Sequence, residues 1–165
     1  FQAMRGPQPA GVSLVRQVGW REWVALPDIG VRRLRAKFDT GARACALHAH
    51  RIKFVQTAEG EQIRFKLQSK SKWRQVPFIG YRRIKDTGGK VTERPAIVTT
   101  IEIGGTSFEA EVCLIDRSAM RHRLIIGRQA IAGRFLVDAS QIFLRPLVNE
   151  ASEPVQTIST IDYQS

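Results

Sequence analysis

Apolar and polar residues alternate along much of the chain, in short stretches that end at glycine, proline or polar turns. In the stretch 63–67 the apolar side chains fall at every second position, which is the period of a strand with one buried face. The stretches 100–103 and 106–112 flank Gly104 and Gly105, a pattern that predicts a hairpin. Further strands are expected in the ranges 19–26, 31–38, 44–55, 76–85, 90–100, 124–126, 135–137 and 142–144.

Helical spacing is almost absent from the sequence. Residues 128–133 have it for one or two turns, and Gly133 ends it. Many short strands with one short helix indicate a small, barrel-like all-β domain. The chain of 165 residues has the size of one domain with a substantial core. We expect this domain in residues 18–147, after a flexible N-terminal segment (1–17) and before a polar tail (148–165).

Two features of the sequence bear on its compartment. The first four residues, Phe1-Gln2-Ala3-Met4, look like the remnant of a cloning site, so a signal peptide could have been removed. The two cysteines, Cys45 and Cys113, make no disulfide framework and fit a reducing compartment. We therefore expect a cytoplasmic protein. No run of about 18 apolar residues is present, so no membrane partner is expected.

A formal net charge of +11 and a pI of about 10.6 set the electrostatic character of the chain. Such a charge suits an acidic partner, which could be nucleic acid, an anionic membrane surface or an acidic peptide. A basic surface without a specific partner accounts for the charge equally well. The charge therefore favours anionic partners, but it does not identify which of these classes binds.

The strand 31–38 leads directly into Asp39-Thr40-Gly41-Ala42. A carboxylate beside a core needs hydrogen bonds or a charged partner, or it keeps its proton. Gly41 permits a close approach of the backbone, and the hydroxyl of Thr40 can both donate and accept hydrogen bonds. An ordinary turn between two strands explains the tetrapeptide as well, since turns favour the same residues. A catalytic interpretation needs support from elsewhere in the chain.

That support comes from several stretches in a fixed order. They are Gly19-Trp20-Arg21-Glu22-Trp23, Lys37-Phe38-Asp39-Thr40-Gly41-Ala42-Arg43, Ala46-Leu47-His48-Ala49, Leu124-Ile125-Ile126-Gly127-Arg128 and Gly133-Arg134-Phe135-Leu136-Val137-Asp138. Together they resemble the retropepsin fold. Within that fold the chain is similar to the bacterial retropepsin-like aspartic peptidase family that is often labelled "ATP-dependent zinc protease". The resemblance covers roughly residues 18 to 146.

The resemblance implies an all-β, retropepsin-like acid-protease barrel with one lobe per chain and one short helix after Gly127. It implies a catalytic carboxylate at Asp39, and a flap whose tip is at Gly88 and Gly89, within a hairpin over about 78–98. Arg128 would lie near a dimer contact. The residues implied to support the active-site loop are Thr40, Gly41, Ala42, Ile126, Gly127 and Arg128.

Peptide hydrolysis by carboxylates requires two of them, one as base toward water and one as acid toward the carbonyl oxygen. In aspartic proteases, two carboxylates about 3 Å apart share one proton. A second Asp-Thr-Gly begins at Asp86, but its approach, 81–85, is too charged for a buried strand. We therefore expect Asp86 to be a turn residue. The second acid would be Asp39 of another copy, in a homodimer.

No metal and no other cofactor is expected, in spite of the family label. The sequence has no His-Glu-x-x-His motif and no Gly-Lys-Ser/Thr phosphate loop. His48 and His50 would share one face of the strand 44–55, so two ligands could converge, but Cys45 would point the other way. We interpret His48 as a satisfied histidine beside the core. Cys45 departs from the family pattern, where serine or threonine is expected, and the flap arm 81–85 is unusually basic.

The favoured function is an aspartic-type endopeptidase with a carboxylate dyad formed from Asp39 of two protomers. The family's neighbours include ligases that add glutamates to protein tails, so acidic or glutamate-tailed polypeptides are attractive substrates. One alternative is a peptide-binding module of the same fold without turnover. A less favoured alternative is a basic β-barrel that binds nucleic acid, because the aromatic residues fit better as core and turn residues than as a stacking platform.

Overall fold

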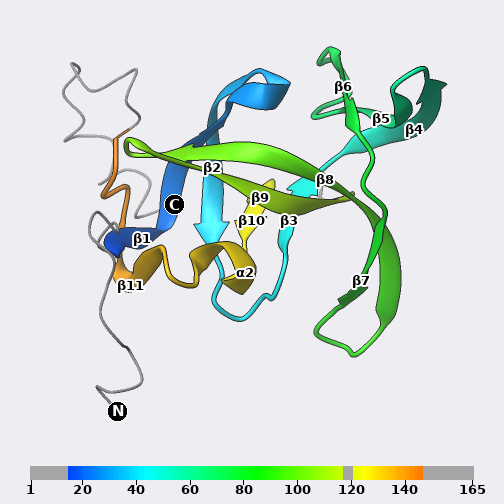
Figure 1. The fold of residues 1–165 in the computed structure, drawn as a ribbon. Helices are drawn as coiled ribbons and strands as arrows, with labels where there is room; N and C mark the ends of the chain where they lie inside the picture. Colours follow the sequence, from blue (N-terminus) through cyan, green and yellow to red (C-terminus); the bar gives the residue numbers. More distant parts are fainter. Residues whose placement is uncertain (1–14, 117–120, 147–165) are drawn as a thin grey trace, which may run out of the picture.

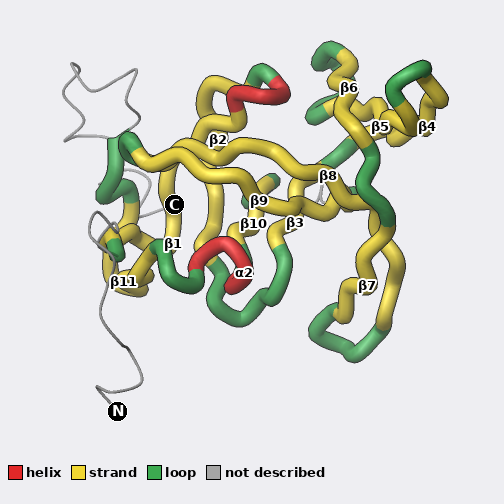
Figure 2. Tube along the Cα trace, viewed as in Figure 1, coloured by secondary structure: helices red, strands yellow, loops and turns green. Residues whose placement is uncertain are grey.

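The computed structural model describes residues 15–116 and 121–146, and strands dominate these ranges (Figure 1). The strands form two sheets, and one short α-helix lies between β10 and β11 (Figure 2). The all-β prediction is confirmed, and the helix follows Gly127 as expected. The elements are β1 (Arg16–Leu26), η1 (Pro27–Ile29), β2 (Val31–Phe38), β3 (Cys45–His48), β4 (His50–Thr57), β5 (Gly60–Lys66), β6 (Trp73–Pro77), β7 (Tyr81–Lys85), β8 (Val91–Ile103), β9 (Thr106–Ile115), β10 (Leu124–Ile126), α2 (Arg128–Ile131) and β11 (Phe135–Ile142).

The larger sheet has eight strands in the order β11-β1-β2-β10-β3-β9-β8-β7. β10 lies between β2 and β3, parallel to β2 and antiparallel to β3, although it comes much later in the chain. Ala25 of β1 also pairs with Glu102 of β8, so the sheet curls until strands near its two edges meet. This topology places the three buried residues of β10 directly beside the end of β2.

One hydrophobic core joins residues from both sheets. Leu26, Leu47 and Ile101 are fully buried in it. Each such side chain contributes about 1.5–3 kcal/mol through the removal of apolar surface from water. Near the end of β2, the ring of Phe38 meets that of Phe135 edge to face, with 5.7 Å between centroids. The last residue of β2 is therefore held by packing just before the chain reaches Asp39.

Glu22 is a fully buried carboxylate in β1. It accepts hydrogen bonds from three backbone N–H groups, those of Gly19 (2.6 Å), Leu144 (2.8 Å) and Arg145 (3.0 Å). Burial raises the pKa of this carboxyl group, and the three hydrogen bonds oppose the rise. Glu22 thus ties the irregular part of β1 to the residues that follow β11.

The smaller sheet is antiparallel, in the order β4-β5-β6, and lies to one side of the larger sheet (Figure 1). Ile63 and Phe65 of β5 are fully buried, and Val76 of β6 joins the same core. The alternation seen in the sequence over 63–67 therefore belongs to a strand with one apolar and one polar face.

Several predicted boundaries are wrong. The range 44–55, predicted as one strand, is divided between β3 in the larger sheet and β4 in the smaller one. The break is at Ala49, whose N–H donates to Ile115 O (2.8 Å) as the chain leaves the larger sheet. The range 76–85 is likewise divided between β6 and β7, because β6 pairs with β5 and not with the hairpin. A period of two identifies a strand but does not show which sheet it joins.

At the ends of the domain, the ranges 135–137 and 142–144 merge into β11, which runs parallel to β1. β1 begins at Arg16, inside the segment expected to be flexible. Residues 1–14 and the predicted tail 148–165 lie outside the described residues. Of the described residues, no helix combines the length and apolarity that crossing a membrane requires.

Candidate active site

Asp39 follows the last residue of β2, in the middle of the larger sheet. Its N–H donates to Ile126 O over 2.9 Å, which extends the parallel pairing of β2 with β10 by one step. Phe38 before it is buried, whereas Asp39 is only half-buried. The strand pairing therefore holds the backbone of Asp39 while its carboxylate reaches the surface of this chain.

The loop after Asp39 is organised by its own backbone. The Oδ1 atom of Asp39 accepts the N–H of Gly41 (2.9 Å), and the Asp39 carbonyl accepts the N–H of Ala42 (3.2 Å). A Cβ at position 41 would lie 3.2 Å from Asp39 Oδ1, closer than most real contacts, so Gly41 suits this approach. Thr40 is exposed, and its carbonyl accepts a hydrogen bond from the guanidinium of Arg128 (3.1 Å).

The start of α2 lies against this loop. The N–H of Arg128 donates to Ala42 O (2.8 Å), and that of Gln129 donates to Arg43 O (3.0 Å). Gly127 is buried here, and a Cβ on it would lie 2.4 Å from Ala44 O. Real Cβ atoms do not approach a carbonyl so closely, so glycine is required for the helix to contact the loop. Ile126, Gly127 and Arg128 therefore contact Asp39 or the loop that follows it, and their role in supporting an active site stays a prediction.

Cys45 contributes to the same contact. Its Sγ accepts the N–H of Gly127 over 3.5 Å, and the side chain is buried. Burial raises the pKa of the thiol, which keeps it neutral. The sulfur thus takes the position of an acceptor for which we expect a hydroxyl, with a longer and weaker hydrogen bond.

The second Asp-Thr-Gly lies at the tip of the hairpin formed by β7 and β8. Asp86 is exposed, and its Oδ1 accepts the N–H of Lys90 (2.9 Å) across the turn. Its backbone N–H donates to Lys90 O (2.9 Å), and its carbonyl accepts the N–H of Gly89 (3.0 Å). Gly89 has φ +88°, a conformation that favours glycine. The prediction that Asp86 is a turn residue is confirmed.

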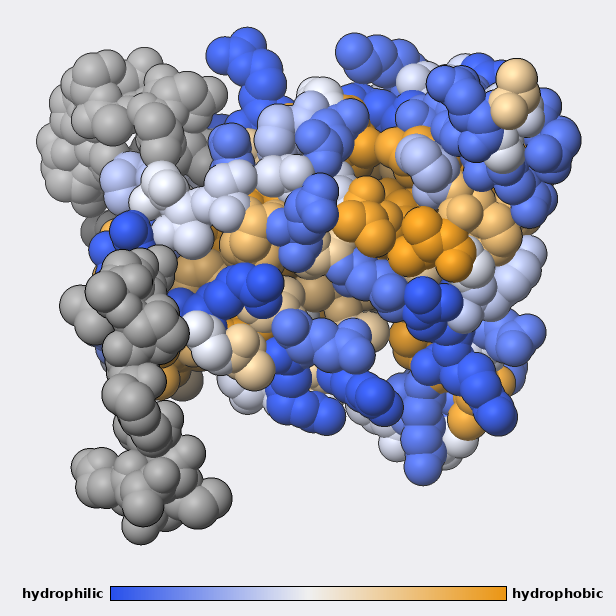
Figure 3. Space-filling model, viewed as in Figure 1, coloured by the Kyte–Doolittle hydropathy of each residue, from blue (hydrophilic) through white to orange (hydrophobic). Residues whose placement is uncertain are grey.

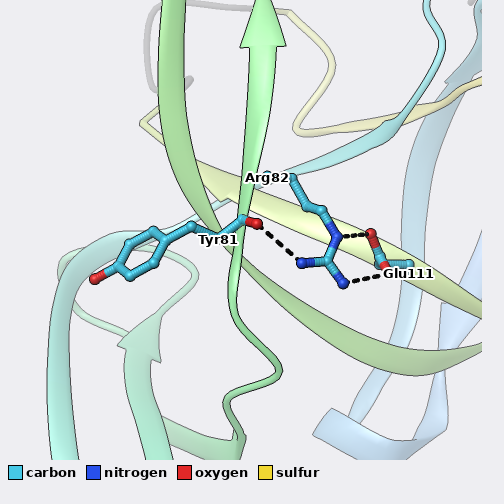
Figure 4. Close-up of polar contacts among 3 residues, drawn as sticks. All are labelled: Tyr81, Arg82 and Glu111. Carbon is cyan, nitrogen blue, oxygen red and sulfur yellow. Dashed lines mark hydrogen bonds and ion pairs between the residues drawn. The ribbon is translucent and has the colours of Figure 1, made fainter.

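Side chains also tie β7, the edge strand of the larger sheet, to β9. Arg82 of β7 donates from Nε to Glu111 Oε1 (2.6 Å) and from NH2 to Oε2 (3.0 Å), a two-point contact with β9 (Figure 4). Arg82 NH1 also donates to the carbonyl of Tyr81 (2.9 Å). The predicted flap residues Gly88 and Gly89 lie at the free tip. That tip and the loop 39–44 lie toward the same end of the molecule (Figure 1).

The histidines do not form the pair that the sequence allowed. His48 ends β3, and its Nδ1 lies 3.6 Å from Asp116 Oδ1, whereas His50 begins β4 in the other sheet and pairs with Lys66. The prediction that the two share one strand face is wrong, because the chain changes sheet between them. No group of three or more His, Cys, Asp or Glu side chains that could hold a metal occurs within the described part of the chain.

Sequence reasoning missed a buried polar pair that joins β1 to the residues before β10. The Nε of Arg21 donates to Nε2 of His122 (3.0 Å), and both side chains are buried. The Arg21 guanidinium also lies over the ring of Trp20, 4.7 Å from its centroid. Burial, followed by the charge of Arg21, lowers the pKa of His122 to about 4, so the imidazole is a neutral acceptor. Arg21 belongs to the Gly19–Trp23 segment, which contributed to the family resemblance, but the sequence alone assigned no role to Arg21.

Comparisons with known proteins agree with this fold. The family model described as retropepsin-like aspartic endopeptidase RimB matches residues 17–147. A probable alpha-L-glutamate ligase of Shewanella halifaxensis is 32% identical over 132 residues, covering 76% of this chain and 29% of the relative. A probable alpha-L-glutamate ligase of Parasynechococcus marenigrum is 34% identical over 127 residues, covering 73% of this chain and 27% of the relative. The chain thus spans under a third of the length of these curated relatives.

Among solved structures, a Legionella pneumophila protein of unknown function is similar, with a TM-score of 0.68 and 26% identity. The similarity covers 78% of this chain and 97% of that protein. The match therefore includes nearly the whole of a known domain. With the family model covering most of the described residues, these findings confirm the resemblance predicted from the sequence, and the chain belongs to the RimB-like family of retropepsin-like aspartic endopeptidases.

Proposed function

We propose that this chain is one half of an aspartic endopeptidase, in which Asp39 from each of two copies forms the catalytic dyad. The observation that carries the proposal is the state of Asp39. Its backbone is held by β10 and the loop, and its carboxylate accepts the N–H of Gly41 and reaches the surface. Within the described residues, no hydrogen bond or ion pair joins Asp39 to a second carboxyl group.

The surface around Asp39 is suited to a second copy. Thr40, Gly41, Arg43 and Arg128 are all exposed next to it. A two-fold axis beside this loop would bring the two Asp39 carboxyl groups together and bury the same residues on both copies. Arg128, held to the carbonyl of Thr40, would then lie at the contact between the copies.

In such a dimer the two carboxyl groups share one proton, since two negative charges about 3 Å apart repel strongly. The ionised Asp39 takes a proton from water, whose oxygen attacks the peptide carbonyl carbon. The protonated Asp39 of the other copy donates its proton to the carbonyl oxygen. The tetrahedral intermediate collapses when the Asp39 that took the proton from water donates it to the peptide nitrogen, which leaves as an amine, while the other Asp39 takes back the proton from the former carbonyl oxygen. The β7–β8 hairpins would cover the bound peptide.

We propose acidic or glutamate-tailed polypeptides as the substrates. The chain has 26 Lys and Arg residues against 15 Asp and Glu, so its surface favours anionic partners. Two curated relatives bear the name probable alpha-L-glutamate ligase, which names glutamate as a component of their chemistry. A peptidase that cleaves glutamate-containing chains would act on polymers built from the amino acid that the names of these relatives mention.

The test is hydrolysis of a mixed peptide library between about pH 4 and about pH 7, the range in which a shared-proton dyad titrates. Wild type and Asp39→Asn are compared, each with and without EDTA. We expect cleavage by wild type, a loss of at least about a thousandfold in Asp39→Asn, and no effect of the chelator. Cleavage that EDTA abolishes would overturn the carboxylate mechanism. A dimeric protein that cleaves nothing would indicate a peptide-binding module instead.

A further inference from the structure

The smaller sheet has one face that the proposed catalytic function does not use. Lys66 of β5 pairs with Trp73 of β6 and with His50 of β4, and Arg64 pairs with Lys53. Because paired residues share a face and positions two apart in a strand do too, these side chains lie on one side of the sheet. Ile63 and Phe65 lie on the other side, in the core.

Four cationic side chains gather around one indole ring on that side. The distances to the Trp73 ring centroid are 4.9 Å from Arg64 Cζ, 5.1 Å from Lys53 Nζ, 5.2 Å from Lys66 Nζ and 6.0 Å from Arg51 Cζ. We call Arg51, Lys53, Arg64, Lys66 and Trp73 the Trp73 face. The surface around β4, β5 and β6 is largely hydrophilic in the view of Figure 3, beside an apolar patch.

The positive charge of the Trp73 face is not balanced by carboxylates in the part of the chain that the structure describes. Among the described residues, no ion pair links a carboxylate to any of its members. Glu61 is in β5, but it alternates with Gln62 and shares the opposite side with Ile63. Each cation–π contact at an exposed site is only weakly stabilising, while the four like charges gathered around one ring repel one another. An added anion would remove the repulsion.

The backbone at Arg51 has an unusual conformation. Its φ is +61°, in the left-handed region that residues with a Cβ seldom adopt, and it lies where the register of β4 with β5 shifts. Such conformations are strained and occur often at binding sites. A regular ladder continued from the Lys53–Arg64 pair would place Arg51 opposite Lys66, but the shift puts His50 there, and the Arg51 guanidinium lies 6.0 Å from the Trp73 ring centroid.

The opposite side of the same sheet contacts the hairpin. The ring of Phe54 in β4 lies 5.1 Å from that of Phe78 and 6.2 Å from that of Tyr81, where β7 begins. The Trp73 face therefore belongs to a sheet whose other side packs against the start of the predicted flap. A polypeptide bound to it would be attached next to the base of the predicted flap and would contact none of the residues of the candidate active site.

We infer that the Trp73 face is a secondary binding site for a run of carboxylates in an acidic polypeptide. In an extended chain, side chains on one side recur about every 6.6 Å, which is also the spacing of Arg64 and Lys66 along β5. Alternate glutamates can therefore meet successive cations. The identity of this polypeptide as substrate rests on the proposed function, whereas its binding does not.

Single-stranded nucleic acid is the other polyanion to consider. It is bound through bases that stack on free aromatic rings, usually several in a row. The Trp73 face has one ring, and cationic groups already lie over it. The Trp73 face thus provides positive charge without a row of free rings for bases to stack on. This favours an acidic polypeptide over single-stranded nucleic acid as the ligand.

The test measures binding in an Asp39→Asn background, so that cleavage plays no part. A fluorescein-labelled peptide of about eight glutamates, long enough to span the face, is titrated by anisotropy. A serine peptide of equal length and an oligothymidylate are titrated in parallel. The test variant combines Arg64→Gln and Lys66→Gln. The matched control combines Arg16→Gln and Arg32→Gln, which removes the same charge from exposed positions in β1 and β2.

We expect the glutamate peptide to bind, the serine peptide not to bind, and the test variant to lose about tenfold in affinity. The control should lose less than about threefold. Equal losses in both variants, or none in either, would overturn the inference. So would tighter binding of the oligothymidylate that depends on Arg64 and Lys66. Failure of wild type to cleave any peptide would overturn the proposed function and leave this result unchanged, because binding is measured without cleavage.

Thermal melting of both double variants shows whether they fold. If the test variant fails to fold, charge reversal at the exposed Lys53 alone, Lys53→Glu, replaces it. We then expect Lys53→Glu to lose affinity for the glutamate peptide. The Arg32→Glu variant is the control and should lose less.

Discussion

The chain contains Asp-Thr-Gly twice, at 39–41 and at 86–88, and the two copies have different surroundings. Asp39 follows a central strand, bonds to Ile126 through its N–H, and has α2 against its loop. Asp86 lies in an exposed hairpin turn that is closed by its own contacts with Lys90 and Gly89. The tripeptide provides a carboxylate and a tight loop in both places. The elements packed behind it distinguish a candidate catalytic residue from a turn residue.

The largest expected difference between the two copies is in catalysis. Asp39→Asn should lower peptide hydrolysis by about a thousandfold or more, since one carboxylate in the pair is then unable to transfer a proton. Asp86→Asn keeps an oxygen that can accept the N–H of Lys90, so its activity should stay within about threefold of wild type. Rates on one cleaved peptide from the library provide the measurement. Equal losses in both variants would remove the functional distinction between the two copies.

The next difference is in stability. In Gly127→Ala, the new Cβ would meet Ala44 O at 2.4 Å, so the loop and helix must separate, at a cost of about 3 kcal/mol in the free energy of unfolding. The matched change at the second copy is Gly88→Ala. There the nearest atom is Asp86 Oδ1 at 3.4 Å, and φ is not positive, so we expect a change within about 0.5 kcal/mol. Urea denaturation of both variants tests this pair. If Gly127→Ala has the same free energy of unfolding as wild type, the helix does not need its close contact with the loop.

The smallest expected effect is on how the free energy of unfolding changes as the pH falls. The pKa of His122 in the folded chain is about 4, below its usual 6.5, because burial and Arg21 disfavour the charged form. As pH falls from about 6.5 toward about 4, the unfolded chain binds a proton that the folded chain excludes, so stability decreases. Glu22 acts in the opposite direction, because its raised pKa lets the folded chain bind a proton first.

The difference between wild type and His122→Gln isolates the histidine. We expect the variant to lose about 1 kcal/mol less stability than wild type between about pH 7 and about pH 5. Denaturant unfolding at the two pH values measures it. His122 lies two residues before β10, so the protection factor of the Asp39 amide, which corrects for the intrinsic slowing of exchange in acid, should fall with acid in wild type more than that of the Asp86 amide. Parallel slopes for wild type and variant would contradict the lowered pKa.

Particular residues show how far the sequence could lead. The period of two in 63–67, the glycine pair at 104–105 and the short helix after Gly127 predicted their elements, because each depends on neighbours in the chain. The same reasoning failed at Ala49, where β3 ends and β4 begins in a different sheet. Local pattern cannot detect that change, since both strands alternate in the same way. Because of that error, His48 and His50 were wrongly predicted to share one strand face.

The candidate site divides along similar lines. The order of motifs identified Asp39 and its loop, and the charged approach to Asp86 was enough to predict a turn residue. The contact of Cys45 Sγ with the N–H of Gly127, the Arg21–His122 pair and the cations around Trp73 were out of reach. Each joins residues whose closeness depends on strand register or on the placement of β10.

By itself, then, the sequence determined the all-β class, the family and the acid to examine, because periodicity, turn chemistry and short motifs are written in consecutive residues. The tertiary structure decided which of two identical tripeptides is backed by a buried strand and helix. It also decided which basic residues, out of 26 Lys and Arg, converge on one indole. Both depend on pairings between segments distant in the chain, and a carboxylate or a cation acquires its chemistry from the groups that such pairings bring near it.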